Sequence, residues 1–509
     1  MLNIINKTLI KSGSYINGCW ITNNTQFDVL NPATQTHLIS LNDAQASDAI
    51  NAVQSAKSAF KGWTALTSYQ RADYLNAWSR LITENEQDLA RLLTLEQGKT
   101  LSEALGEIRY GVSYLHWFSE EGKRIYGDTI PASSGQQRIM VSKQAVGVVT
   151  AITPWNFPNA MLLRKAAAAL ASGCTFTIKP AAETPLSALA LASLAEEAGI
   201  PKGVLNVIVG SDAASIGKVL TEHPDVNKFS FTGSTAIGKK LLAQCAKGVK
   251  KVSMELGGNA PFIVFESADI DSAVSGLMSN KFRNAGQTCV CTNRVFVQDS
   301  IFNEFTDKVT NALKEIKVGD GLDSSSTMGP LVSKKAADKV SELIETALSQ
   351  GAALAYQTPL SLNDKALNNK TLNNKEKNSN TDQQHQLKND CFVAPTLLIN
   401  VTNEMEIAQN EIFGPVISLI GFENEQQVIE QANKTEAGLA AYFYSQQVNQ
   451  IWRVSESLQF GMVGINESAL SNAAAPFGGI KESGNGREGS HYGLDDYLEI
   501  KYLCFGGIE

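Results

Sequence analysis

Apolar residues follow two different patterns along the chain, and the change falls near residue 146. Between about residues 43 and 118 they recur every three or four positions, and Leu75, Trp78 and Ile82 form one such series. This spacing places them on one face of a helix. The pattern therefore predicts a layer of amphipathic helices that packs on a core.

From Val146 onward, short apolar strands alternate with helices. A helix is expected from Pro185 to about Ala198, because Thr184 offers an N-cap and proline fits the first helical position. Alternation of this kind is typical of a parallel sheet covered by helices, in which nucleotides bind at the carboxyl ends of the strands. The expected strands are residues 175–179, 204–209, 226–231 and 251–254.

A second alternating region begins after Leu256. Its strands are expected near residues 261–265 and 294–297, and its helices near residues 301–316 and 334–350. The length of 509 residues exceeds what one hydrophobic core usually supports. We therefore expect a second α/β domain here.

Within this second region, residues 358–390 are rich in asparagine, lysine and glutamine. Such a composition buries too little apolar area on folding to offset the loss of chain entropy. We expect a disordered surface loop at this insert.

The composition is that of an ordinary globular protein, with 43% hydrophobic and 18% charged residues. A net charge of −8 without a basic stripe argues against a nucleic-acid partner. No apolar run reaches the roughly 18–20 residues that cross a bilayer, and the first residues, MLNIINKTLIKSGSY, do not resemble a signal peptide. Seven scattered cysteines suit a reducing compartment, so we expect a cytoplasmic protein without a membrane partner.

Cys289 is a candidate nucleophile in the segment FRNAGQTCVCTN, where Gly286 allows a sharp turn. A cysteine needs a lowered pKa or a nearby base to act in this way. The five histidines are far apart in sequence, so we expect neither a metal site nor a histidine base. Glu255 ends a strand before two glycines, where a carboxylate can serve as the base. Taken alone, the cysteine also fits a buried apolar position and the glutamate a solvated surface.

Six separate segments together resemble the signatures of the aldehyde dehydrogenase superfamily, in that family's order and spacing. The resemblance covers nearly the whole chain, and the insert at residues 358–390 is the main departure. The segments are VSMELGGNAPFIVF, FRNAGQTCVCTNR, ITPWNFPNAMLLRKAAAALASGCTFTIKPAAETP, FTGSTAIGK, EIFGPV and PFGGIKESGNGREGS.

The resemblance implies an α/β fold with three parts and a homodimer or homotetramer. A Rossmann-type cofactor domain would comprise residues 1–123 and 147–255, and an α/β catalytic domain residues 256–475. A small β oligomerisation element would comprise residues 124–146 and 488–509.

The resemblance also assigns catalytic roles. Cys289 would attack the aldehyde carbon as a thiolate and form a thiohemiacetal. The side-chain amide of Asn156 and the backbone N–H of Cys289 would stabilise the oxyanion. After hydride transfer to the nicotinamide, Glu255 would activate the water that hydrolyses the thioester. A glutamate at this position separates the hydrolytic enzymes from relatives that transfer the acyl group to coenzyme A.

The cofactor is implied to be NAD or NADP, although no GxGxxG fingerprint follows the strand that ends at Lys179. By the resemblance, Lys179 would reach the adenosine ribose, and Gly233 and Ser234 would present backbone N–H groups to the pyrophosphate. Glu411 would bind the nicotinamide ribose. The other residues implied to contact the cofactor are Trp155, Asn156, Pro180, Ala181, Ala182 and Leu256.

Position 182 bears on the choice between the two cofactors. Relatives that select NAD often have a glutamate there, which repels a 2′-phosphate. Here the residue is Ala182, and Glu183 follows it. With no repelling charge at this position, Lys179 could pair with the phosphate. We expect NADP to be accepted, and a preference for it is open.

Within the superfamily, the CVC pair, RKAAAALASGC and HYGLDDYLEIKYLC most resemble the succinate-semialdehyde dehydrogenases of γ-aminobutyrate degradation. By this resemblance Arg164, Arg283 and Ser471 would bind the distal carboxylate of the substrate, for which a guanidinium is well suited. Four alternatives stay open: a glutarate-semialdehyde dehydrogenase, a general aldehyde dehydrogenase, a catalytically silent relative, and a thiol-redox protein that uses Cys289 and Cys291.

Overall fold

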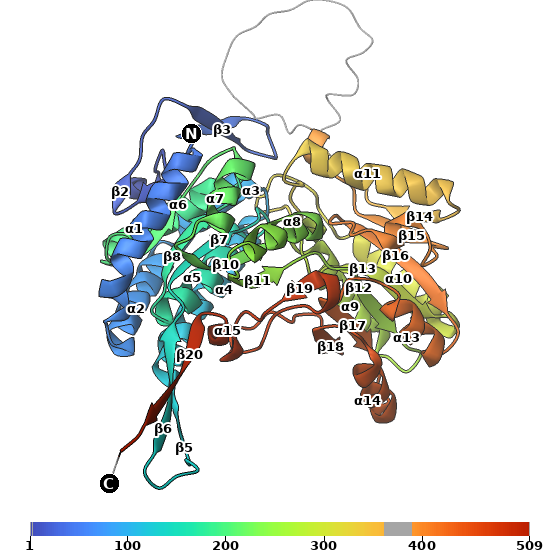
Figure 1. The fold of residues 1–509 in the computed structure, drawn as a ribbon. Helices are drawn as coiled ribbons and strands as arrows, with labels where there is room; N and C mark the ends of the chain where they lie inside the picture. The colour runs from blue at the N-terminus through green and yellow to red at the C-terminus, as the bar shows by residue number, and fades with distance from the viewer. Residues whose placement is uncertain (1, 3, 361–388, 508–509) are drawn as a thin grey trace, which may run out of the picture.

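A computed structural model describes residue 2, residues 4–360 and residues 389–507, which form two large sheets, a small protruding sheet and the helices that cover them (Figure 1). Most of the insert expected to be a disordered loop, residues 361–388, lies outside the described residues. Among the described helices, none combines the length and the apolar character needed to cross a membrane.

The first large sheet has the strand order β19-β11-β10-β7-β8-β9-β1-β2. The neighbours from β11 to β9 are parallel, whereas β1 and β19 pair with their neighbours in antiparallel fashion. The parallel sheet predicted from the alternating pattern is confirmed. The strands are β1 (Tyr15–Ile16), β2 (Cys19–Trp20), β7 (Val148–Ile152), β8 (Thr175–Lys179), β9 (Leu205–Val207), β10 (Val226–Thr232), β11 (Lys251–Glu255) and β19 (Gly484–Asn485). A separate two-stranded sheet pairs β3 (Gln26–Leu30) with β4 (His37–Asn42).

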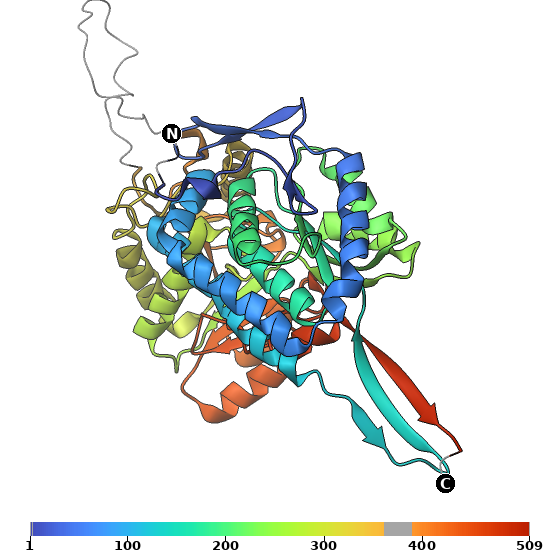
Figure 2. The ribbon, with the colours of Figure 1, turned by 90° about the vertical axis from the view of Figure 1, so that its left-hand side faces the viewer.

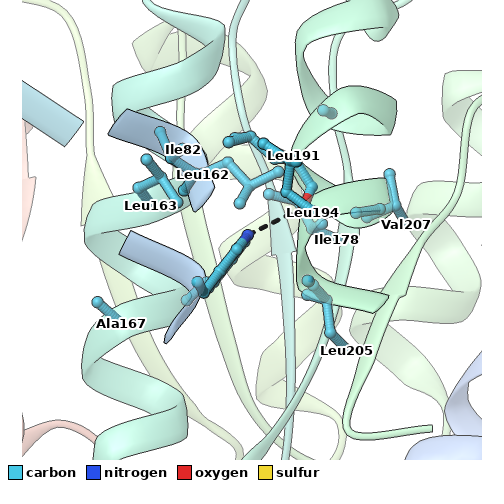
Figure 3. Packing of buried hydrophobic residues seen from close by; sticks show 14 of the residues in the cluster. Ile82, Leu162, Leu163, Ala167, Ile178, Leu191, Leu194, Leu205 and Val207 are labelled. Carbon is cyan, nitrogen blue, oxygen red and sulfur yellow. Dashed lines mark hydrogen bonds between the residues drawn. The ribbon is translucent and has the colours of Figure 1, made fainter. Parts of the chain in front are cut away.

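The amphipathic helices predicted for the N-terminal region are also confirmed. Leu75, Trp78 and Ile82 are fully buried. In Figure 3, Ile82 packs with Leu162 and other aliphatic side chains of the helices and strands around it. The helices of this half are α1 (Ala46–Thr64), α2 (Ser68–Glu84), α3 (Glu86–Gln97), α4 (Leu101–Glu121), α5 (Pro158–Ala171), α6 (Pro185–Glu197), α7 (Ala213–Glu222) and α8 (Thr235–Ala246).

Helix α6 begins where the sequence predicts, but Thr184 does not cap it. The side chain of Thr184 makes no cap hydrogen bond. Instead, the Glu96 carboxylate of α3 accepts hydrogen bonds from the backbone N–H groups of Leu186 at 2.7 Å and Ser187 at 2.8 Å. A buried carboxylate from another helix thus satisfies donors that a local threonine was expected to satisfy.

The second large sheet has the order β14-β15-β16-β13-β12-β17-β18 and confirms the second α/β region. All its neighbours are parallel except β14 and β15. Its strands are β12 (Ala260–Val264), β13 (Thr292–Gln298), β14 (Ala353–Gln357), β15 (Thr396–Ile399), β16 (Val416–Phe422), β17 (Ala440–Tyr444) and β18 (Met462–Ile465). Its helices are α9 (Ile270–Phe282), α10 (Phe302–Leu313), α11 (Lys334–Ser349), α12 (Glu406–Gln409), α13 (Glu425–Asn433) and α14 (Val448–Ser457), and the short α15 (Tyr492–Asp495) follows β19.

A three-stranded antiparallel sheet, in the order β20-β6-β5, extends away from the body of the molecule (Figures 1 and 2). Its strands are β5 (Asp128–Ile130), β6 (Arg138–Ala145) and β20 (Leu498–Phe505). The two segments expected to join subunits therefore meet in one sheet. Glu488, the first residue of the second segment, lies instead in the protein interior and is only 6% exposed.

The chain passes from the first sheet to the second between Glu255, the last residue of β11, and Ala260, the first of β12. This crossing coincides with the boundary expected between the two larger domains. It also places Glu255 at the carboxyl end of a parallel strand and beside the second sheet. The candidate residues gather around this crossing.

Candidate active site

Two cavities meet at Cys289. The larger has a volume of about 290 Å³, and the smaller, of about 20 Å³, shares Phe157, Met161 and Cys289 with it. The predicted residues that line the larger cavity are Trp155, Asn156, Gly233, Ser234, Glu255, Leu256, Cys289 and Glu411. Those that line the smaller one are Arg164, Arg283, Cys289 and Ser471.

The segment before Cys289 turns sharply, as the sequence predicts. Asn284, Ala285 and Gly286 all adopt left-handed φ values, of 52°, 54° and 78°. Such values are unfavourable for the first two residues, which must be held by their surroundings. The backbone N–H of Asn284 donates to Glu103 at 2.6 Å, which fixes the turn from α4.

The Cys289 thiol is half-buried, and its pKa is raised to about 12. Burial is the main cause, and the nearby carboxylates of Glu411 and Glu255 add to it, while Arg164 opposes them. The Cys289 thiol therefore holds its proton at neutral pH. A positive charge in the larger cavity would favour the thiolate.

Glu255 is 3% exposed, and neither of its carboxylate oxygens has a hydrogen-bond partner among the described residues. Burial, followed by the charge of Glu488, raises the pKa of Glu255 well above its usual value. Arg164 and Lys165 oppose this effect. Glu255 is thus a carboxyl group in the cavity wall without a hydrogen-bond partner among the described residues, and its surroundings favour the protonated form over the ionised form that acts as a base.

Asn156 is buried in the loop between β7 and α5. Its Nδ2 atom donates to the carbonyl of Gln287 at 2.9 Å, two residues before the nucleophile. The Asn156 carbonyl accepts hydrogen bonds from Lys99 Nζ at 2.8 Å and from Asn284 Nδ2 at 2.9 Å. An amide nitrogen carries two hydrogens, so one remains for an oxygen near Cys289.

On the cofactor side, Glu411 Oε1 accepts a hydrogen bond from the Gly258 backbone at 3.1 Å, and burial raises the pKa of Glu411 to about 7. Ser234 lies at the N-cap of α8. The Gly233 N–H group, expected to face a pyrophosphate, donates to the Glu255 carbonyl at 3.0 Å in this structure, and its role toward the cofactor stays a prediction. An anion at this helix would use the following N–H groups.

Lys179 is the last residue of β8, and Pro180, Ala181 and Ala182 follow it. None of these four residues lines the larger cavity. The ammonium group of Lys179 is buried, which lowers its pKa, while three carboxylates oppose this shift. Those carboxylates belong to Glu183, Asp43 and Asp212. Position 182 itself is uncharged, but these three carboxylates act on Lys179 from other positions.

Arg164 lines the smaller cavity but already has a partner. Its Nε atom lies 2.5 Å from Glu488 Oε2, in a pair whose side chains are 1% and 6% exposed. The contact is a charge pair without hydrogen-bond geometry, since Nε and Nη2 both have no hydrogen-bond partner among the described residues, and these donors could still bind another anion. Glu488 also contacts Lys165 Nζ at 2.5 Å. These two cations outweigh burial and hold the pKa of Glu488 below its usual value.

Arg283, by contrast, has no carboxylate within 4 Å among the described residues. It is half-buried, and its guanidinium lies 4.9 Å from the centre of the Phe157 ring. A half-exposed cation on the wall of a cavity can bind an incoming anion without first breaking an ion pair. Ser471, also half-buried, lines the same cavity.

Cys291 is buried and lies away from solvent. Its sulfur is 3.5 Å from the Thr292 carbonyl and 3.8 Å from that of Lys281, and burial raises its pKa. Both Cys289 and Cys291 are free thiols in the structure. Oxidation of this pair stays a prediction.

The sequence reasoning missed several charged residues that support the site. Lys99, Glu107, Lys165 and Glu488 are buried charges that pair with one another. The available signal was a lysine or glutamate within an otherwise apolar helical pattern, because such residues are rarely buried unless paired. The sequence did not show which residues would pair.

Comparison with known proteins identifies the family of this chain. The model of the aldehyde dehydrogenase family matches residues 20–373 and 369–503. The chain is 50% identical to 3-sulfolactaldehyde dehydrogenase of Pseudomonas putida over 511 residues, covering 100% of both chains. It is also 50% identical to the NADP(+) succinate-semialdehyde dehydrogenase of Escherichia coli, covering 99% of this chain and 100% of that one.

Glutarate-semialdehyde dehydrogenase of Pseudomonas aeruginosa is 49% identical, covering 98% of this chain and 99% of the relative. Among solved structures, that of an NADP-dependent enzyme of E. coli superposes with a TM-score of 0.92 at 49% identity, covering 99% of this chain and 100% of the other. The protein belongs to the aldehyde dehydrogenase family.

Proposed function

We propose that this aldehyde dehydrogenase oxidises succinate semialdehyde to succinate and reduces NADP or NAD. The main observation behind this is that Arg283, a cation without a carboxylate partner among the described residues, lines the same small cavity as Cys289. The three relatives are named for succinate semialdehyde, glutarate semialdehyde and 3-sulfolactaldehyde, each of which has an acidic group away from the aldehyde carbon. A cation near the nucleophile suits all three.

In the first step, the Cys289 thiol loses its proton to solvent water, and the thiolate sulfur forms a bond to the aldehyde carbon. The carbonyl electron pair moves to oxygen, where the Asn156 amide and the Cys289 N–H donate hydrogen bonds. Because burial and two carboxylates keep the resting thiol protonated, this step depends on a change of charge in the larger cavity.

The lining of the larger cavity suits the nicotinamide and pyrophosphate end of a dinucleotide, and the adenosine end would lie outside it, toward Lys179. Glu411 presents a carboxylate held by only one backbone N–H, and a side chain at Gly257 would come within 3.0 Å of it. Glu411 would hold the nicotinamide ribose, α8 the pyrophosphate through Ser234, and Lys179 the adenosine ribose. The bound nicotinamide would supply the hydride acceptor and a positive charge near the thiol.

Hydrolysis of the thioester is assigned to Glu255. Once ionised, its carboxylate accepts a proton from water as the water oxygen forms a bond to the acyl carbon. The carbon–sulfur bond then breaks, the electron pair returns to Cys289, and the acid product leaves. The lack of a hydrogen-bond partner for either oxygen suits this role, because no bond must be broken first.

The test is kcat/KM for succinate semialdehyde, glutarate semialdehyde, 3-sulfolactaldehyde and butanal, each with NADP and NAD. Wild type should prefer succinate semialdehyde. Arg283→Ala should lower kcat/KM for the anionic aldehydes by about ten- to a hundredfold, since it removes a charge-assisted hydrogen bond, and should affect butanal far less. Arg164→Ala gives a less specific readout, because it also leaves Glu488 without one of its partners.

A preference for butanal would indicate a general aldehyde dehydrogenase, and a preference for either other anionic aldehyde would replace the substrate proposed here. Absence of cofactor reduction with every aldehyde would support a catalytically silent relative. Arg283→Lys is the matched control, because it keeps the charge but not the planar fork.

Assembly through the three-stranded sheet is part of the same proposal. Ile500 and Tyr502 of β20 are 72% and 62% exposed, and Met140 of β6 is 46% exposed. Exposed apolar side chains on a protruding sheet are typical of a surface that another subunit covers. A homodimer or homotetramer is therefore proposed, and a cytoplasmic location stays a prediction from the sequence.

A further inference from the structure

Residues 97–107 form the corner between α3 and α4. This corner contacts the loop that carries Asn156 and the segment that leads to Cys289. At its centre, Lys99 Nζ lies 2.5 Å from Glu107 Oε2, and both side chains are 0% exposed. Burial lowers the pKa of Lys99, and the charge of Glu107 opposes this. Burying Lys99 and Glu107 costs desolvation free energy, and the attraction between the two charges offsets only part of this cost.

This ion pair holds the loop of Asn156. Lys99 Nζ also donates to the Asn156 carbonyl at 2.8 Å. Glu107 Oε1 accepts hydrogen bonds from the backbone N–H groups of Asn159 at 2.9 Å and Ala160 at 3.2 Å, in the first turn of α5. The corner therefore restrains the chain on both sides of Phe157, a residue that lines both cavities.

The same corner also holds the segment of Cys289. Glu103 Oε1 accepts the hydrogen bond from the Asn284 backbone, and Asn284 Nδ2 donates to the Asn156 carbonyl. The Asn156 carbonyl thus has one donor from the corner and one from the nucleophile segment. Together these bonds fix the separation between Asn156 and Cys289.

An ion pair of this kind is a weak explanation for stability alone, because well-packed apolar residues of similar volume often stabilise a protein as well or better. What apolar residues cannot do is bind a carbonyl group in one orientation. An oxyanion site requires its donors to be held within a few tenths of an ångström.

We propose that Lys99 and Glu103 are positioning residues of the oxidation. They hold the Asn156 main chain and the Cys289 segment so that the Asn156 amide and the Cys289 N–H converge on one oxygen. This rests on the proposed oxyanion role of Asn156 and is independent of which aldehyde is the substrate.

The experiment is a double-mutant cycle with Lys99→Met, Asn156→Ala and the double variant. The readout is the rate constant of the first turnover of reduced cofactor, at saturating cofactor, with succinate semialdehyde and with butanal. Lys99→Met alone should slow this step by about ten- to a hundredfold, the effect of misplacing a catalytic group by about 1 Å. In the Asn156→Ala background it should slow the step less than about threefold, because there is no amide left to position.

Glu96→Gln is the matched fold control. Glu96 caps α6 with a buried carboxylate, as Glu107 caps α5, but it makes no contact with Asn156. Glu96→Gln should lower Tm and leave the first-turnover rate constant within about twofold of wild type. Should Lys99→Met fail to fold, Glu103→Ala takes its place in the cycle, with an expected loss of several-fold because Glu103 is only half-buried.

The inference would be overturned if Lys99→Met, or Glu103→Ala in its place, slowed the first turnover by the same factor in wild type and in Asn156→Ala. The corner would then be a purely structural support. An Asn156→Ala variant with an unchanged first turnover would overturn both the oxyanion role and this inference. The outcome of the aldehyde panel would be unaffected in either case, since the cycle compares rates for the same aldehyde.

Discussion

The two cavities that meet at Cys289 differ in the ionisable groups of their walls. The larger cavity has the carboxyl groups of Glu255 and Glu411 together with Lys339, and the smaller has the guanidinium groups of Arg164 and Arg283. Burial raises the pKa of Cys289, the carboxylates of Glu411 and Glu255 add to this, and Arg164 opposes them. The thiol therefore lies at the boundary between an acidic side and a basic side.

The two cavities therefore serve two different roles, control of the Cys289 charge and selection of the substrate. The acidic side favours the protonated thiol until positive charge enters, which suits a nucleophile that should react only when its cofactor is bound. The basic side attracts an anionic aldehyde and is almost filled by side chains, with a volume of about 20 Å³. Changes in the larger cavity should alter activation, and changes in the smaller one should alter substrate choice.

The largest effect is expected at the boundary itself. Cys289→Ala should reduce turnover at least about a thousandfold with every aldehyde, because no other group supplies the nucleophile. Glu255→Gln should keep a burst of reduced cofactor and then turn over very slowly, because acylation precedes the step that needs the base. Stopped-flow absorbance measures both phases. Wild-type turnover in Glu255→Gln would show that another group is the base.

The next largest effect is expected on the choice between NADP and NAD, at the adenosine ribose. Ala182→Glu should raise KM for NADP about tenfold or more relative to NAD, by placing a carboxylate near the 2′-phosphate. Glu183→Gln should act in the opposite direction, since Glu183 is the carboxylate that acts most strongly on Lys179. Equal changes for both cofactors in both variants would show that this loop does not face the ribose.

A smaller effect tests the acidic side directly. Glu411→Gln should lower the pKa of Cys289 and increase its alkylation by iodoacetamide in the free enzyme by several-fold at pH 9, since it removes a like charge. The pKa of Glu411 is about 7, so wild-type Glu411 is neutral at pH 6 and the difference should vanish there. A ratio that does not change with pH would contradict this, and Glu404→Gln at the exposed surface serves as the control.

The smallest effect is expected from Cys291. Cys291→Ala should leave basal activity largely unchanged, because this thiol lies outside both cavities. If oxidation joins it to Cys289, the variant should no longer recover activity when a dithiol reductant follows an oxidant. Unchanged inactivation and recovery would end the hypothesis of a redox pair.

Periodicity and local motifs in the sequence were sufficient to predict most of the fold. The strand at residues 175–179 and the start of α6 at Pro185 were predicted at the observed residues, since both depend on neighbours in the chain. The resemblance to a family identified residues that the structure brings together around Cys289, among them Glu255 and Asn156. The spacing of these residues along the chain did not by itself predict that they lie close together.

Only the tertiary structure decided which residues are the partners of the buried polar groups. Glu96 caps a helix that begins 89 residues later, and Glu488 pairs with Lys165 across 323 positions. By the resemblance Arg164 would bind the substrate, and in the structure it also lies beside Glu488, while the Gly233 N–H group donates to the Glu255 carbonyl. A buried charge or N–H group must find a partner wherever the fold brings one within reach. Local sequence sets which groups are buried, and the packing of distant segments sets what satisfies them.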